Sequence, residues 1–457
     1  MEKQMENRKI HQKIVWGYKI ELLSPLSVSS GEAEETDQDV QRDAAGCPFI
    51  PGTSVAGALR AYSLIVVKGV DKEQLFGTKE QNETQENEKN KDKEQSFMSS
   101  LIIGDLYFEK GNKIVTRDGV RLENKVAVDK NKFEMEVIDT GAKGFGSITA
   151  VIREGTSAES VKEYIKKLFA AVNQGEIYLG ANKNRGLGRV KITKLVEKVF
   201  DRDNVDEWIN FQYEDLQEKN DIDDITHVVS EEIRESLFVK IKVPLQLSGG
   251  IMIRKYSTKS AEVDFEHITS NQKAVVPGSS WNGAIRDRIR DIWISAGLQV
   301  NQIDQAIWEM FGYVEEEIKE ESKIKRSKAR QSYVMVAESE FTEGKMLPTT
   351  RNKISRFEAA AVNGALFTEE VFYEGKTVLE LRVRKEGNEE KYKWMVGILL
   401  LAIKDLSNGY LAVGGQTAVG KGIFERTGTI EISEATEDEY LRSLWECRKE
   451  KIKVGNQ

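Results

Sequence analysis

The chain has 457 residues and is 39% hydrophobic, which is enough for two or three domains that each bury a core of their own. No apolar run is long enough to span a bilayer and the first residues are polar, so we expect a cytoplasmic protein without membrane contact. Two cysteines and three histidines exclude a disulfide framework and a zinc site of the usual spacing, and the net charge of −8 argues against a uniformly basic nucleic-acid-binding surface.

The first half of the chain alternates strand and helix signals. In chain order we expect a strand over residues 14–26, a polar loop over 27–46, and a helix from about residue 52 with Ser54 as N-cap. A polar insertion over 78–97 and a β-rich region over 101–153 follow. The half ends with an amphipathic helix capped by Thr156 and ended by Gly175, and with a hairpin whose arms are 177–179 and 189–195. The insertion has no apolar periodicity and nothing to bury, which predicts disorder.

The second half repeats this order. We expect a strand over 237–247, a polar loop over 248–276, a helix from about Ser280, a charged insertion over 319–330, a β-rich region over 334–384, a long helix over 389–407, and strands at 411–413 and 427–432. Between the halves, residues 201–235 hold thirteen acidic and three basic residues, which we interpret as an acidic connector over 201–236. Strand, helix, strands, helix, strand, occurring twice, predicts an α+β fold of two ferredoxin-like units.

Three landmarks recur in the same order in the two halves, which we call copy one and copy two. Residues 50–60 read Ile-Pro-Gly-Thr-Ser-Val-Ala-Gly-Ala-Leu-Arg, and residues 276–286 read Val-Pro-Gly-Ser-Ser-Trp-Asn-Gly-Ala-Ile-Arg, an offset of 226 (277 − 51). Leu75-Phe76-Gly77 recurs as Met310-Phe311-Gly312, and the glycine-rich loop 180–188 recurs as 414–422. Units of about 200 residues are too long for a solenoid repeat, so the pattern indicates two fused homologous domains.

The glycine-rich loop of copy one is a candidate phosphate site. Its glycines allow backbone N–H groups to approach an anion closely, and Lys183 and Arg185 add positive charge. A plain hairpin turn is the alternative. In copy two the only cation of the loop is Lys421.

The copy-two loop also resembles a nucleotide-binding P-loop, with Gly415, Gly420 and Lys421 at the required spacing. Gly422 stands where that motif needs Ser or Thr, and the residues after it indicate a strand rather than a helix. We therefore reject the P-loop interpretation.

The Pro-Gly-(Ser/Thr)-Ser segments open helices, and a helix N-terminus can bind an anion. Ser54 and Ser280 lie at these starts, and Arg60 and Arg286 lie about a turn and a half further in. A turn followed by a capped helix explains each segment alone. The recurrence indicates a shared structural role and makes phosphate binding a hypothesis.

The polar loops before these helices carry acidic residues at matched places. Asp37 precedes Pro51 by 14 residues, and Asp264 precedes Pro277 by 13. Such a carboxylate could position a metal-bound or 2′-hydroxyl nucleophile, whereas the alternative is a solvated surface acid. His267 has no counterpart in copy one, which favours surface or packing over a general base.

Together these landmarks resemble the RAMP superfamily, specifically the backbone subunits of type III CRISPR effector complexes. The resemblance implies two tandem modified ferredoxin-like (RRM-like) RAMP domains with thumb-type β insertions. The domains would cover 1–200 and 237–432, followed by a C-terminal tail or helix over 433–457. Residues 350–356 with 364–367 resemble the family's thumb, and the matching region of copy one, around 121–146, is more diverged.

The resemblance also implies partners and sites. The partners are guide (CRISPR) RNA, target single-stranded RNA and other CRISPR effector subunits. Active relatives cleave target RNA through a loop aspartate with a divalent metal, Mg or Mn, which assigns catalysis and metal binding to Asp37 and Asp264. The implied RNA-binding residues are Ser54, Arg60, Lys183, Arg185, Arg189, Ser280, Arg286, Arg351, Arg356 and Lys421. Val419 and Ile423 replace Arg185 and Arg189 in copy two, a departure that weakens the RNA-binding hypothesis there.

Two alternatives stay open. The same architecture could be a purely structural guide-RNA scaffold, with other subunits cutting the target. A stand-alone endoribonuclease that matures the guide precursor is the other alternative. The scarcity of histidines counts against it, because metal-independent RNA scission commonly uses a histidine base.

Overall fold

The computed structural model describes residues 9–29, 31, 36–66, 72–77, 98–123, 126–218, 222–230, 236–256, 263–314, 329–387 and 389–455. The insertion expected over 78–97 and most of the one expected over 319–330 lie outside these residues. The chain forms two compact units. Unit 1 contains residues 1–116, 135–181 and 188–236, and unit 2 contains 117–134, 182–187 and 237–457. We describe each unit by itself.

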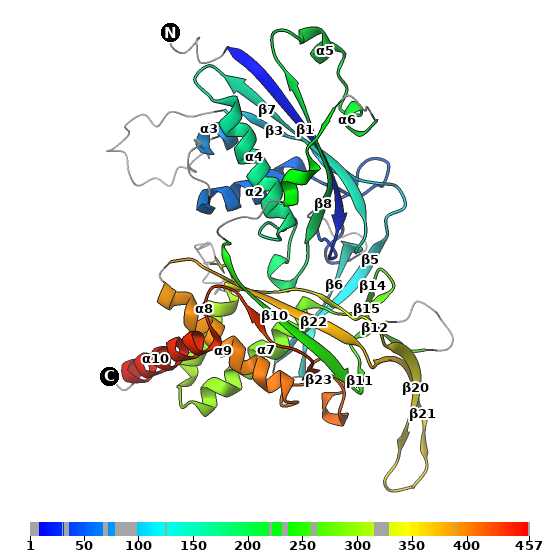
Figure 1. Ribbon diagram of the computed structural model, residues 1–457. Helices are drawn as coiled ribbons and strands as arrows, with labels where there is room; N and C mark the ends of the chain where they lie inside the picture. The colour runs from blue at the N-terminus through cyan, green and yellow to red at the C-terminus, as the bar shows by residue number, and fades with distance from the viewer. Residues whose placement is uncertain are drawn as a thin grey trace, which may run out of the picture. The chain divides into compact units, whose positions relative to one another are not determined.

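Unit 1 is built on one antiparallel sheet (Figure 1). Its elements are β1 (Ile10–Leu22), β2 (Phe49–Ile50), α2 (Gly52–Val66), α3 (Lys72–Phe76), β3 (Leu101–Ile103), β4 (Leu106–Phe108), β7 (Lys143–Arg153), α4 (Ala158–Asn173), β8 (Val190–Phe200), α5 (Val205–Asn210), α6 (Asp215–Glu218), β9 (Asp223–Asp224) and the 3-10 turn η2 (Thr226–Ser230). The central strand β1 pairs with β7 and β8, and β3 pairs with the outer side of β7. The order β8-β1-β7-β3 is that of a ferredoxin-like sheet.

Helices cover both faces of the unit 1 sheet, which explains why the middle of β1 is a continuous buried run. Tyr18 packs against Phe169 of α4, with ring centroids 5.3 Å apart. On the other face, Leu216 of α6 approaches Gly17 so closely that a Cβ there would lie 2.8 Å from the Leu216 Cβ. Residues 201–236, expected as a connector, therefore contribute α5, α6, β9 and η2 to unit 1, where Phe200 packs edge-on against Trp208 at 5.0 Å.

Unit 2 repeats the arrangement. Its elements are β10 (Phe238–Ser248), β11 (Gly250–Ile251), β12 (Arg254–Tyr256), β13 (Phe265–His267), β14 (Thr269–Ser270), β15 (Lys273–Val276), α7 (Gly278–Ser295), α8 (Val300–Phe311), β16 (Tyr313–Val314), β17 (Ala329–Arg330), β18 (Val334–Val336), β19 (Ser339–Glu340), β20 (Lys345–Ile354), β21 (Ala361–Tyr373), β22 (Lys376–Arg384), α9 (Glu389–Ser407), β23 (Ile423–Arg426), β24 (Glu431–Ile432) and α10 (Glu437–Gly455). The sheet order β23-β10-β22-β18 matches that of unit 1 strand for strand.

The core of unit 2 lies between this sheet and the helices α7, α9 and α10. Trp281, Ile285 and Ile289 recur every four residues along α7 and are fully buried. On α9, Gly397 lets α10 approach, because a Cβ there would lie 2.4 Å from the backbone oxygen of Tyr440. The stretch expected as a tail or helix over 433–457 is thus largely the docked helix α10.

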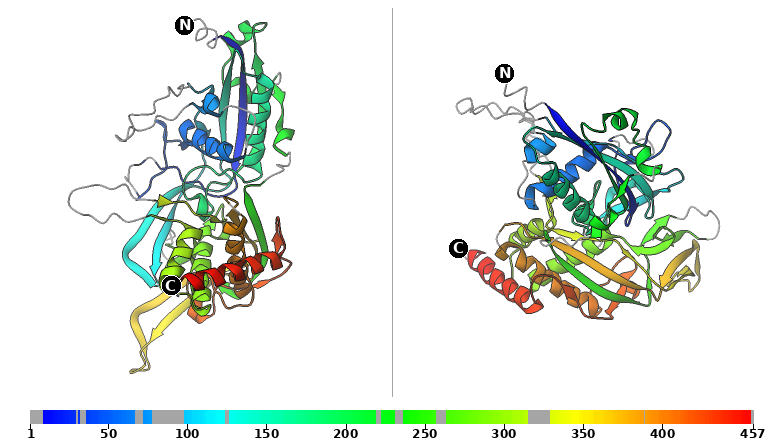
Figure 2. Two further views of the ribbon diagram at one scale, coloured as in Figure 1. Left: turned by 90° about the vertical axis from the view of Figure 1, so that its left-hand side faces the viewer. Right: turned by 45° about the horizontal axis from the view of Figure 1, so that its top comes forward.

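A long hairpin, β20–β21, extends away from the helices of unit 2 in both views of Figure 2. Its base belongs to a second sheet of order β11-β21-β13-β12. Arg351 of β20 pairs with Phe367 of β21, and Phe357 at the turn is fully exposed. The predicted thumb is therefore a two-stranded hairpin whose outer half stands clear of the unit 2 core.

A second hairpin is formed by β5 (Ile114–Glu123) and β6 (Val126–Ile138). Residues 117–134 of this hairpin belong to unit 2. Arg117 Nη1 contacts Glu338 Oε2 at 2.5 Å, and both side chains are buried. The diverged thumb expected in copy one is therefore a hairpin as well.

The repeat extends to single hydrogen bonds. Ser99 Oγ lies within hydrogen-bond distance of the carbonyl oxygens of Leu75 and Leu101, each at 2.7 Å. Ser332 Oγ contacts the carbonyls of Met310 and Val334 in the same way, at 3.1 and 2.6 Å. The α+β fold class with two ferredoxin-like copies is confirmed.

Local details differ from the sequence-based expectations. Ser54 and Ser280 lie within the first turns of α2 and α7 rather than at their N-caps, because the helices begin at Gly52 and Gly278. The N-cap of α4 is Ser157 rather than Thr156, and its side chain accepts the Ser160 N–H. Residues 177–179 and 411–413 form no strands. A backbone hydrogen bond from Leu179 to Gly188, and one from Val413 to Gly422, close the glycine-rich loops instead.

Candidate nucleic-acid interface

The two glycine-rich loops have the same backbone. Each contains one 3-10 turn, η1 (Lys183–Arg185) or η3 (Thr417–Val419), entered through a left-handed residue, Asn182 or Gln416. In copy one the Leu179 N–H donates to the Gly188 oxygen, and in copy two the Val413 N–H donates to the Gly422 oxygen, both at 2.9 Å.

Gly188 and Gly422 are required for this closure. Both have positive φ, and a Cβ would lie 1.8 Å from the Leu179 oxygen or 1.9 Å from the Val413 oxygen. No side chain fits at either place. The loops are therefore rigid supports whose chemistry depends on the residues between the glycines.

The cations of the copy-one loop differ in exposure. Arg185 is exposed, whereas Lys183 and Arg189 are half-buried. Burial lowers the pKa of Lys183. Residues 182–187 belong to unit 2, where a Cβ on Gly186 would lie 2.4 Å from the Glu338 nitrogen. Arg185 is therefore the more accessible cation of this loop, and Lys183 is partly covered.

In the copy-two loop the cation is buried instead. Lys421 occupies the place that Leu187 holds in copy one, and it is 5% exposed. The nearby Glu369 is fully buried and accepts hydrogen bonds from Arg254 and Gln416. Burial alone raises the pKa of Glu369, but these two hydrogen bonds and the charges of Arg254 and Lys421 together hold it below its usual value.

The acidic loops of both copies are anchored at equivalent places. Gln38, directly after Asp37, bridges in parallel to Met135 of β6. Phe265, directly after Asp264, pairs in parallel with Glu369 of β21. In each copy the aspartate therefore lies beside the second strand of its hairpin. Both aspartates are exposed.

The partners of the two loops are different. In copy one the buried Asp39 accepts from the Thr36 N–H and hydroxyl, while Glu136 accepts from the Val40 N–H and from Arg42. In copy two the Thr368 N–H donates to Asp264 Oδ2 at 2.9 Å. The sequence did not single out Glu136 or Thr368, because only the parallel pairing of loop and hairpin brings them to the acidic loops.

The motif helices present a second common feature. Gly57 of α2 and Gly283 of α7 are exposed, and a Cβ at either would meet no atom within 4 Å. A glycine inside a helix costs about 0.5–1 kcal/mol relative to alanine. Arg60 and Arg286 follow three residues later, on the same side of each helix. Bare helix surface next to a cation suits the close approach of a phosphate backbone.

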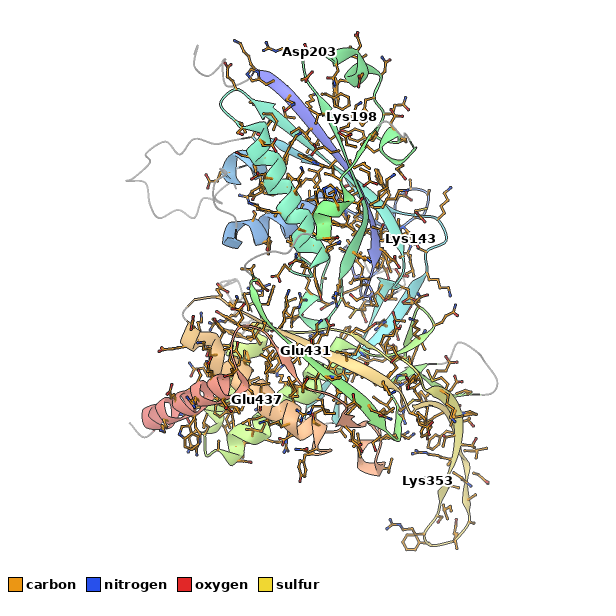
Figure 3. The ribbon with its side chains drawn as sticks, viewed as in Figure 1. Lys143, Lys198, Asp203, Lys353, Glu431 and Glu437 are labelled. Carbon is orange, nitrogen blue, oxygen red and sulfur yellow. The ribbon has the colours of Figure 1, made fainter. Side chains whose placement is uncertain are left out.

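The β20–β21 hairpin carries more cations and one aromatic residue. Arg351 is half-buried, whereas Arg356 and Lys353 are exposed (Lys353 in Figure 3). The exposed ring of Phe357 at the turn was missed by the sequence analysis, since a lone aromatic residue in a polar stretch has no periodicity. Such a ring can stack on a nucleobase.

His267 is a packing residue. It is 1% exposed, its Nδ1 accepts the Ile253 N–H at 3.2 Å, and its Nε2 lies 3.1 Å from the Val275 oxygen. Burial lowers its pKa to about 4. Of the two alternatives, surface or packing, the structure selects packing.

The described residues contain no group of three or more His, Cys, Asp or Glu side chains that could hold a metal. A single exposed aspartate in each loop, Asp37 or Asp264, fits Mg²⁺ or Mn²⁺ only where water and substrate phosphates supply the other ligands, a coordination that Mg²⁺ commonly adopts. No helix in the described part of the chain is long and apolar enough to cross a membrane.

Comparison with known proteins identifies the family. The RAMP superfamily model matches residues 19–191 and 248–425, one match for each copy. The chain belongs to the RAMP superfamily. A comparison with curated proteins finds no significant match. Membership supports a CRISPR-associated, RNA-binding role among effector subunits, in agreement with two copies that place loops, helices and hairpins alike.

Proposed function

We propose that this RAMP protein is a backbone subunit of a cytoplasmic type III CRISPR effector complex. It binds guide RNA and cleaves the complementary target RNA through Asp37 and Asp264. The observation that carries the proposal is the equivalent placement of the two acids. Each exposed aspartate directly precedes a residue that pairs in parallel with the second strand of the adjacent hairpin. A fused pair of such sites would act at two points of one target.

The residues have separate roles in this proposal. Arg185 and the cations of the β20–β21 hairpin hold the guide backbone, and Arg60 and Arg286 bind phosphates next to the bare surfaces of Gly57 and Gly283. The carboxylate of each loop orients the nucleophile at the scissile phosphate and takes up its proton. A divalent metal, when bound, would neutralise charge on that phosphate.

A non-catalytic scaffold is the second candidate, and one observation favours it. Asp264 Oδ2 already accepts the Thr368 N–H, so in copy two part of the carboxylate is used to hold the loop. A scaffold needs the same guide-RNA contacts and no acid at either loop.

The test uses the reconstituted complex with guide RNA and a labelled complementary target. Asp37→Asn combined with Asp264→Asn should abolish cleavage at the sites served by this subunit while guide loading stays unchanged. Adding a chelator to the wild-type complex should give the same loss. Cleavage that is identical in wild type and the double variant assigns cutting to other subunits and leaves the scaffold role.

A further inference from the structure

Glu369 lies near the base of the β20–β21 hairpin, and both of its oxygens are engaged. Arg254 Nη2 donates to Oε1 at 2.7 Å, and Gln416 Nε2 donates to Oε2 at 2.5 Å. Because a carboxylate only accepts, this contact determines which end of the Gln416 amide faces Glu369. Gln416 Oε1 must therefore point elsewhere.

Two polar groups beside Glu369 are buried without a partner. Lys421 Nζ and Gln416 Oε1 make no hydrogen bond to any described residue. An unpaired ammonium and an unpaired amide oxygen are both costly in a buried setting. Burial lowers the pKa of Lys421, and the charges of Arg351 and Arg254 act in the same direction while Glu369 opposes them. We call these five residues, Glu369, Arg254, Gln416, Lys421 and Arg351, the Glu369 cluster.

Copy one shows that the fold itself does not need these groups. Leu187 holds the place of Lys421, Asn182 that of Gln416, and Met135 that of Glu369. Leu187 and Met135 are buried and apolar. The polar groups of copy two are therefore additions to a backbone that is also built with apolar side chains, which points to a ligand rather than to folding.

We propose that the Glu369 cluster binds one ribonucleotide of the guide RNA, with its phosphate at Lys421, Arg254 and Arg351 and its 2′-hydroxyl donating to Gln416 Oε1. The inference rests on the proposed function and specifies where copy two holds its RNA. Three cations and one carboxylate give the cluster a net charge of +2 (3 − 1), which suits a phosphodiester. The 2′-hydroxyl is the donor that DNA lacks.

The cluster also compensates for the weak loop of copy two. Val419 and Ile423 stand where copy one has Arg185 and Arg189, so η3 itself offers no guanidinium. The Arg254 side chain is 47% exposed and forms an accessible edge, whereas Lys421 is buried. Glu369 acts as a positioning residue, because it orients Arg254 and Gln416 without reaching the ligand.

The experiment measures binding of the full-length chain to single-stranded RNA, and to DNA of the same sequence, over a range of salt concentrations. Lys421→Leu and Gln416→Asn each install the residue that copy one has at that place. Lys404→Leu removes a half-exposed cation of α9, which is paired with Glu437 of α10, and serves as the charge control. Melting temperature is recorded for every variant, and inorganic phosphate is the competitor.

Lys421→Leu should raise the melting temperature of the free protein, because a buried unpartnered cation is replaced by an apolar side chain. It should also weaken RNA binding and flatten the slope of log affinity against log salt by about 0.7. Gln416→Asn should reduce the preference for RNA over DNA about five-fold, the effect of one hydrogen bond. Lys404→Leu should change neither the slope nor the preference.

Three outcomes would overturn the inference. If Lys421→Leu lowers the melting temperature and leaves the salt slope unchanged, the lysine is structural. If Gln416→Asn leaves the RNA preference intact, the 2′-hydroxyl assignment is wrong. If inorganic phosphate competes fully and RNA and DNA bind wild type equally, the cluster is a general phosphate site. A wild-type chain that binds no RNA at all contradicts the proposed function itself.

Discussion

Asp37 and Asp264 each lie one residue before a parallel contact with the second strand of a hairpin, made by Gln38 with Met135 and by Phe265 with Glu369. This relationship gives the two acids the same position in two copies of one fold. Under the proposed function, each acid would act at its own position on the target.

The two acids should therefore act independently. Asp37→Ala should remove one cut in the target, and Asp264→Ala should remove another at a fixed spacing, each by at least about 100-fold. Guide loading should survive, because a carboxylate next to RNA adds repulsion rather than affinity. Gel mapping of a labelled target cut by each assembled variant checks this. Loss of both cuts in either single variant would contradict independent sites.

The two cations of the first glycine-rich loop, Lys183 and Arg185, should contribute to RNA affinity. Lys183→Ala with Arg185→Ala should weaken guide binding and flatten the salt slope by up to about 1.4, the value for two full phosphate contacts of 0.7 each. Arg185 should account for most of the effect because Lys183 is half-buried. Titrations with each single variant at several salt concentrations test this, and an unchanged slope for Arg185→Ala would exclude a phosphate contact.

The exposed helical glycines should show a conflict between stability and binding. Gly57→Ala and Gly283→Ala should each stabilise the protein by about 0.5–1 kcal/mol, because a Cβ meets no atom and helix propensity improves. Each should nevertheless weaken RNA binding, since the added methyl group holds the phosphate backbone away. Melting curves and RNA titrations, with Ser295→Ala at the end of α7 as control, measure both effects. Unchanged RNA affinity would leave the two glycines without a binding role.

Acid should destabilise unit 2 through His267. Its pKa falls from about 6.5 in the unfolded chain to about 4 in the folded protein, so the unfolded state binds the proton first as pH drops. The stability contributed by the neutral ring is complete above about pH 6.5 and is lost towards pH 4, a change of about 3 kcal/mol. Urea titrations between pH 7 and pH 4 measure this loss. In His267→Gln the pH dependence should shrink, and a slope equal to that of wild type would contradict the assignment.

The internal repeat carried most of the sequence-based prediction. The sequence predicted the bounds of α4 and α9 to within one or two residues, and the repeated Pro-Gly-(Ser/Thr)-Ser segments located the starts of α2 and α7. The ferredoxin-like order of elements followed from comparing the halves, because the same order of strands and helices recurs in both. The predictions made from the spacing of apolar residues within one helix were correct where helix propensity and the burial of the apolar face agreed, as in α4 and α9.

The predictions that failed depended on contacts between distant residues. Ser54 resembled an N-cap, but the helix starts earlier, where the Gly52 N–H donates to Asp105. Lys421 is buried beside Glu369, and no local pattern in the sequence shows this placement. Glu136 and Thr368 were missed for the same reason, whereas Phe357 was missed because a lone aromatic residue in a polar stretch has no periodicity. Whether the predicted site residues bind or cleave RNA stays a prediction.

Gly188 and Gly422 also bear on how the two copies can diverge. Because the closure of each loop depends on backbone atoms and on the absence of a Cβ, the side chains between the glycines can change without altering the path of the chain. A gene fusion that retains both glycines can therefore give its halves different ligand chemistry on one template. Replacing Thr417-Ala418-Val419 by the Lys-Asn-Arg of copy one should therefore change the charge of the loop while its backbone keeps the same path.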